Sequence, residues 1–124
     1  MAQAVLEKGK QAYNLEVKPI FQVISNSQKF PLPISRIEYD GIKLAFYKPY
    51  KMTVEFDDEF GCLKHRNAKL GIVISAYTLD ELVAEFFEWF VSDWRGYAQA
   101  DNSKLSECAI EQKHTLLSMA MEVE

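Results

Sequence analysis

Four residues of the chain have the ligand chemistry of a structural zinc site, namely Cys62, His65, Cys108 and His114. Zinc prefers thiolate and imidazole ligands in a tetrahedral set of four. The spacing argues against one shared ion, because Cys108 and His114 lie six positions apart on an expected helix and therefore point about 120° apart. A buried cysteine and an exposed histidine explain these residues separately. The sequence therefore predicts no metal ion and no other cofactor.

Nucleophilic catalysis would use Cys62 with His65 or His114, since a reactive thiolate needs a basic or cationic neighbour that lowers its pKa. That Cys62 and His65 are close in the sequence does not establish that the thiol and an imidazole lie within hydrogen-bonding distance. The chain contains no G-x-S-x-G, H-E-x-x-H, C-x-x-C or glycine-rich phosphate loop, and its five glycines are widely spread. These observations favour a protein that is not an enzyme.

An acidic run, Asp57-Asp58-Glu59, follows an expected strand. Carboxylates in a cluster can hold a divalent cation or act as an acid and base pair. Adjacent side chains diverge at the end of a strand, so a solvated turn is the simpler interpretation. These three acids are also the first candidates for contact with a cationic partner.

Charge is divided unevenly along the chain. The net charge is −4 overall, with a net +3 in residues 1–50 and a net −7 in the remainder. An acidic part of this size argues against nucleic-acid binding there, because affinity for phosphates comes mainly from Lys and Arg. It favours a basic protein partner, although such acids also form the solvated side of amphipathic helices.

Segments of β-branched, aromatic or alternating character predict four or five strands. Asp40-Gly41 lies between two of them and is typical of a type I′ hairpin turn. Lys48-Pro49-Tyr50 is expected to turn the chain into the following strand. The expected strands are Leu15 to Ile24, Ile34 to Tyr39, Ile42 to Tyr47, Met52 to Phe56 and Leu70 to Ala76.

Two helices are expected after the strands. Thr78 and Glu81 form a capping box, in which the Thr hydroxyl and the Glu carboxylate satisfy each other's backbone amides. Ser106 is the expected N-cap of a second helix that reaches toward Glu122, and Gly96 is the expected end of the first. Strands followed by helices predict an α+β fold: an antiparallel sheet of four to five strands with two C-terminal helices packed on one face.

The length of 124 residues predicts a single domain spanning residues 1–124, with residues 1–13 as a loose arm or a short helix. No run of 18 apolar residues and no export signal is visible. We therefore expect no membrane association and a cytoplasmic location with both thiols reduced.

Aromatic and apolar residues cover more than one face of the first expected helix. One sheet cannot cover so wide a stripe, so part of it should meet the second helix or another molecule. Phe87 and Trp89 are the candidates for contact with a partner, although such residues at helical spacing more often belong to a core.

The stretches Val54 to Cys62 and Gly71 to Leu82 together resemble HicB-type antitoxins. In that family a strand ends in an acidic turn with Gly-Cys, and another strand then enters a helix capped by Thr or Ser with Glu three residues later. The resemblance covers roughly residues 50–95. It implies a small α+β fold related to a truncated ribonuclease-H-like sheet, no catalysis, and neutralisation of a small basic RNA-cleaving toxin.

The chain departs from the family pattern in several places. Phe60 stands where a turn proline is usual, and residues Leu63 to Leu70 insert four basic or histidine side chains before the next strand. Nothing after Asp101 resembles the DNA-binding module that many members carry. We therefore expect a protein-binding module for a small basic partner. The alternatives are a self-associating structural domain, which makes a homo-oligomer, and a small-ligand-binding domain with an aromatic-lined pocket where sheet and helix meet.

Overall fold

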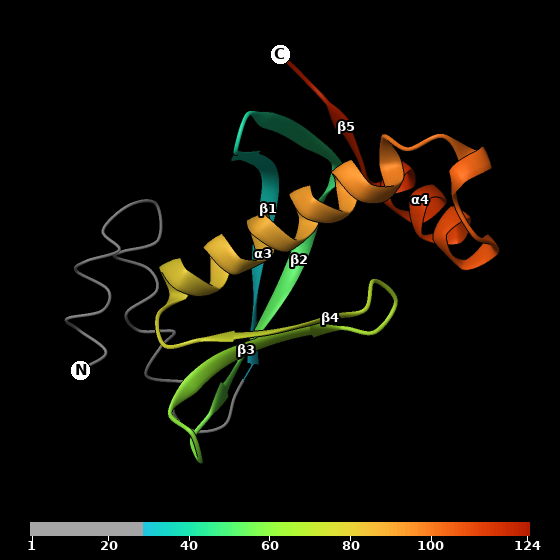
Figure 1. Cartoon of the computed structure of the whole chain (residues 1–124). Helices are drawn as coiled ribbons and strands as arrows, with labels where there is room; N and C mark the ends of the chain where they lie inside the picture. Colours follow the sequence, from blue (N-terminus) through green and yellow to red (C-terminus); the bar gives the residue numbers. More distant parts are fainter. Residues whose placement is uncertain (1–28) are drawn as a thin grey trace. The chain divides into compact units, whose positions relative to one another are not determined.

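The computed structural model describes residues 29–124 (Figure 1). The strand expected at Leu15 to Ile24 and the arm expected at residues 1–13 lie outside the described residues. The described chain divides into two compact units. Unit 1 contains residues 29–32 and 52–85, and unit 2 contains residues 33–51 and 86–124. Two strands and one helix contribute residues to both units.

The fold class is α+β, as the sequence predicts. An antiparallel sheet comes first and two helices follow it (Figure 1). The sheet has the strand order β1-β2-β3-β4, and β5 pairs with β2. The elements are β1 (Lys29–Tyr39), β2 (Ile42–Asp57), β3 (Cys62–Asn67), β4 (Ile72–Ala76), α3 (Leu79–Asp93), α4 (Glu107–Met119) and β5 (Ala120–Glu122).

β2 is one strand of 16 residues where the sequence suggested two strands and a turn. The alternation of buried residues keeps its parity across Pro49, with Phe46 buried before it and Tyr50 and Met52 after it, and only Lys48 in this series is exposed. Proline removes one backbone donor but fits the φ of an extended chain, so a strand tolerates it where that donor has no acceptor. The expected turn at Lys48-Pro49-Tyr50 is therefore wrong. The hairpin turn at Asp40-Gly41 is confirmed, with φ angles of 50° and 84°.

β3 is a strand that the sequence analysis missed within the segment from Leu63 to Leu70. It pairs with β2 in the register Glu55↔Lys64 and with β4 in the register His65↔Ile74. Leu63 and His65 are buried and alternate with more exposed charged residues. This is the period of two that a half-buried strand requires.

Both turns around β3 have the same chemistry. Asp57 Oδ1 accepts from the Glu59 and Phe60 amides at 3.0 and 3.3 Å, and Asn67 Oδ1 accepts from the Leu70 amide at 3.2 Å. Each turn ends in a glycine with positive φ, 66° at Gly61 and 75° at Gly71, a conformation that costs other residues energy. An Asx residue followed four positions later by glycine therefore marks both ends of β3.

The predicted start of α3 is confirmed, because the Glu81 amide donates to Thr78 Oγ1 at 3.0 Å. The α-helix ends at Asp93 and continues as a π-helical turn, Trp94–Ala98, which contains Gly96. Neither helix among residues 29–124 is long and apolar enough to cross a membrane.

Aromatic rings form the core of unit 2. Phe86 and Phe90 of α3 and Trp94 of the π-helical turn that follows it recur every four residues and are each at most 2% exposed. Tyr50 stacks on Phe86 with ring centroids 4.7 Å apart, and Phe46 meets the edge of Phe90 at 5.1 Å. Much of the aromatic surplus noted in the sequence therefore belongs to the core of this unit.

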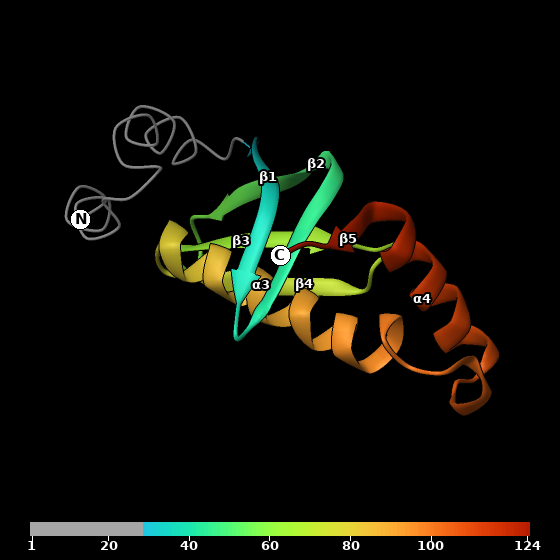
Figure 2. The same cartoon turned by 90° about the horizontal axis from the view of Figure 1, so that it is seen from above.

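The C-terminus returns to the sheet, which the sequence analysis did not predict. Ser106 caps α4 as expected, since its Oγ accepts from the Ala109 amide at 3.2 Å. The helix ends at Met119 rather than near Glu122, and β5 then pairs with β2 from Phe46↔Ala120 to Leu44↔Glu122 (Figure 2). The pairing satisfies backbone groups of residues 120–122, which solvent would otherwise have to hydrate.

Candidate functional site

The four possible zinc ligands divide between the two units. Cys62 and His65 lie on β3 in unit 1, whereas Cys108 and His114 lie on α4 in unit 2. Residues 29–124 contain no group of three or more His, Cys, Asp or Glu placed to hold a metal ion. Both cysteines are free thiols.

His65 has a structural environment. Its side chain is buried, at 2% exposure, and Nδ1 lies 3.0 Å from the Thr53 carbonyl oxygen. A carbonyl only accepts, so Nδ1 carries the proton and donates in this hydrogen bond. Because His65 lies on β3 and Thr53 on β2, this hydrogen bond adds a further link between the two strands, beyond the paired residues Glu55 and Lys64. Burial lowers the pKa of His65, because the charged imidazolium loses its hydration.

The three residues of the acidic run have different roles: Asp57 stabilises the turn, and Asp58 and Glu59 face solvent. Asp57 accepts from two turn amides and forms an ion pair with Lys64 at 2.9 Å. The hydrogen bond from Lys64 is the main reason that the pKa of Asp57 is lowered. Asp58 and Glu59 are exposed, and the Phe60 ring beside them is 67% exposed. Asp57 thus holds the hairpin, and the next three side chains are accessible.

Charged side chains on the outer face of the β2–β3 pair form ion pairs with each other. Arg66 Nη2 donates to both carboxylate oxygens of Glu55 at 3.0 and 3.1 Å. Lys64 pairs with Asp57 in the same way across the strands. Two of the basic residues in the segment that departs from the HicB pattern are therefore paired with acids, so they add little positive potential to this face.

The exposed side of α3 is acidic. Glu81, Glu85 and Glu88 are exposed and recur at helical spacing, so they lie along one side of the helix. The helix carries five carboxylates and no Lys or Arg. Phe87 and Trp89 are half-buried beside this row, and their ring centroids lie 6.4 and 6.3 Å from those of Phe86 and Phe90, respectively. Both predicted contact residues thus have one side against the core and another open.

β4 is a sheet edge with apolar side chains in solvent. Among the described residues it pairs only with β3. Val73 in β4 is 76% exposed, and Tyr77, which directly follows the strand, is 72% exposed. From Ile72 to Tyr77 the chain has no charged residue and no proline, although these are the features by which natural proteins protect an open edge.

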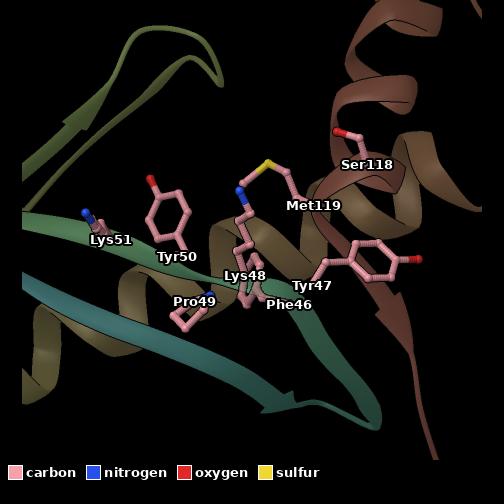
Figure 3. A pocket seen from close by; sticks show the side chains of 8 residues that line it. All are labelled: Phe46, Tyr47, Lys48, Pro49, Tyr50, Lys51, Ser118 and Met119. Atoms are coloured by element: carbon pink, nitrogen blue, oxygen red, sulfur yellow. The ribbon is translucent and has the colours of Figure 1, made fainter.

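A pocket of about 440 Å³ opens in unit 2 between residues 46–51 of β2 and the end of α4, at Ser118 and Met119 (Figure 3). Its lining includes two lysines, Lys48 and Lys51. The sequence analysis missed this site, having assigned residues 48–50 to a turn. The available signal was Lys48 itself, which interrupts a row of buried residues between Phe46 and Tyr50.

Comparison of the chain with protein-family models, with curated proteins and with solved structures finds no match.

The buried histidine makes stability depend on pH. The pKa of His65 is lower in the folded chain, so the unfolded chain binds this proton first as pH falls through 6.5, and folding stability is lost. We expect the free energy of unfolding to decrease between neutral pH and pH 5 by up to about 1.4 kcal/mol per pH unit, the limit for one proton. Urea unfolding at several pH values measures this decrease.

The variant His65→Gln keeps a donor for the Thr53 carbonyl but has no proton to gain in this range. It should flatten the pH profile between neutral pH and pH 5, whereas His114→Gln, at an exposed position, should leave the profile unchanged. A wild-type profile that is flat, or that only His114→Gln flattens, would show that burial of His65 does not control it.

Proposed function

We propose that this chain is a non-enzymatic protein-binding module that captures a small basic protein on the exposed side of α3. The observation that carries the proposal is the row of exposed carboxylates at Glu81, Glu85 and Glu88 on a helix without a basic residue. A row of carboxylates of this kind concentrates negative potential, which attracts and orients a cationic partner.

Phe87 and Trp89 would supply the apolar part of the contact. Interfaces typically combine an aromatic anchor with a polar rim, because aromatic rings bury a large area with few rotatable bonds. The packing of each ring beside a core ring of α3 restricts its motion, so little further ordering is needed on binding. Asp58 and Glu59 in the exposed turn of unit 1 are a separate acidic candidate for contact with a partner of this kind.

We further propose that the partner is a toxin-like protein and that the chain acts as an antitoxin of HicB type. The support is the resemblance over residues 50–95: an acidic turn ending in Gly61-Cys62, and a strand that enters a helix capped by Thr78. A small RNA-cleaving protein needs a basic surface for its substrate. The acids of α3 would cover that surface and thereby inhibit the toxin, in the cytoplasm where both proteins would be made.

The test is capture from native lysate by the tagged full chain, followed by measurement of the affinity for the protein recovered. We expect a small basic protein that is released as salt rises, because screening weakens the attraction between opposite charges. The double variant Glu85→Gln with Glu88→Gln should weaken binding about tenfold, in line with the loss of two charge contacts.

The matched control is Glu111→Gln with Glu124→Gln, which removes the same charge from two exposed positions outside α3. It should change the affinity far less than the α3 variant. Equal weakening by both variants would show that only net charge matters. A captured protein that is acidic, or whose binding does not respond to salt, would contradict the proposal.

A second candidate function is self-association through β4, and the open apolar edge favours it. Two copies of a strand without charges can pair antiparallel without placing like charges opposite each other. β1 at the other edge has Pro31, Pro33, Arg36 and Glu38, all of which hinder such pairing. A twofold dimer would continue the sheet and cover Val73 and Tyr77.

Sedimentation velocity over a range of micromolar concentrations tests this candidate. We expect a monomer–dimer equilibrium that Val73→Lys shifts at least about tenfold toward the monomer, because the new charge would be buried in the pairing. Ser35→Lys adds the same charge at an exposed position of β1 and should leave the equilibrium unchanged. A monomer at all concentrations, or a dimer that Val73→Lys does not weaken, would remove β4 as the interface.

A further inference from the structure

We infer that the pocket between β2 and the end of α4 binds a small organic anion with a planar apolar body. This inference is independent of the proposed capture of a basic protein, because the carboxylates of α3 do not line the pocket. The two sites would also select opposite charges. The pocket volume of about 440 Å³ lies within the range typical of sites for small organic ligands.

The charge of the lining is the first observation. The chain has a net charge of −4, yet the pocket lining includes Lys48 and Lys51 and no carboxylate. Both lysines are exposed. Lys48 has the parity of the inward-facing residues of β2 and Lys51 lies on the opposite side of the strand, so the ammonium group of Lys48 faces the concave surface and Lys51 adds positive potential beside it.

The position of Lys48 is the second observation. Inward-facing residues of β2 are buried at Phe46, Tyr50, Met52 and Val54, and Lys48 has the same parity. Its side chain is exposed only because the pocket opens at this point. Figure 3 shows Lys48 rising from β2 toward Met119, which is also part of the lining. A lysine in an apolar row thus brings its ammonium group to the opening.

The apolar part of the lining is the third observation. Phe46 and Tyr50 flank Lys48 with ring centroids 5.8 Å apart and ring planes inclined by 31°. Tyr50 is held by its stacking on Phe86, so this floor is rigid. Met119 lies opposite, and its flexible thioether adapts readily to the shape of a flat ligand.

The end of the β2–β5 ladder explains why the space is open. The pairing runs from Leu44↔Glu122 to Phe46↔Ala120, and the residues before Ala120 belong to α4. β5 therefore does not continue along residues 47–51 of β2. The change from helix to strand leaves a concave surface in which Lys48 and Lys51 flank aromatic residues.

The test is titration of the full chain, labelled with nitrogen-15, with indole-3-acetate and with phenyl phosphate. These two probes distinguish a carboxylate from a phosphate head group. We expect at least one of them to shift the amide signals of residues 46–51 and 118–119 saturably. The uncharged probe indole-3-acetamide and inorganic phosphate alone should each bind at least about tenfold more weakly, since each lacks one of the two recognised features.

The double variant Lys48→Gln with Lys51→Gln should weaken binding of the preferred probe about tenfold or more. The control Lys43→Gln with Lys69→Gln removes the same charge from two other exposed positions and should leave the affinity nearly unchanged. Signals that shift outside the pocket, an amide that binds as well as the anion, or equal loss in both variants would overturn the inference. These outcomes leave the capture of a basic protein by α3 untouched, because they concern different residues.

Discussion

The buried row of rings on α3 is the constraint on which unit 2 depends. Phe86, Phe90 and Trp94 occupy one side of the helix, and the β2 residues Phe46 and Tyr50 pack against this row. The last ring of the row also holds the C-terminus: the Trp94 indole donates to Glu122 at 2.7 Å, and Gln99 Nε2 donates to the same oxygen at 2.8 Å. These two hydrogen bonds, led by the one from Gln99, lower the pKa of Glu122.

Both proposed sites follow from that row. With one side of α3 committed to rings, the exposed carboxylates are confined to the other side, where Phe87 and Trp89 remain partly open. With Glu122 held, β5 keeps its pairing with β2, and the end of α4 is fixed beside residues 46–51. The acidic side of the helix and the cationic pocket thus depend on the same core while differing in charge and in the ligand they suit.

The parts of the fold that the sequence predicts are those encoded within a few residues. The caps at Thr78 and Ser106 and the turn at Asp40-Gly41 follow from hydrogen bonds or φ angles local to the turn. β5 could not be predicted in this way, because its backbone partners lie on β2, far away in sequence. β3 was not predicted, because its charged residues were considered only as an insertion before the next strand, whereas Lys64 and Arg66 are paired with acids across the strands. The pocket is lined by two segments that are distant in sequence, residues 46–51 and 118–119, and only Lys48 gave a local sign of it.

If α3 has one structural side and one binding side, the two tryptophans of the chain should respond differently to a basic ligand. Trp89 is half-buried beside the carboxylates, and Trp94 is buried and bonded to Glu122. Their indole N–H signals can be followed by NMR while a short oligolysine peptide is added as the basic probe. We expect the Trp89 signal to shift saturably and to return when salt is raised, while the Trp94 signal stays in place. A shift of the Trp94 signal alone, or no shift of either signal, would contradict the division of α3 on which the account rests.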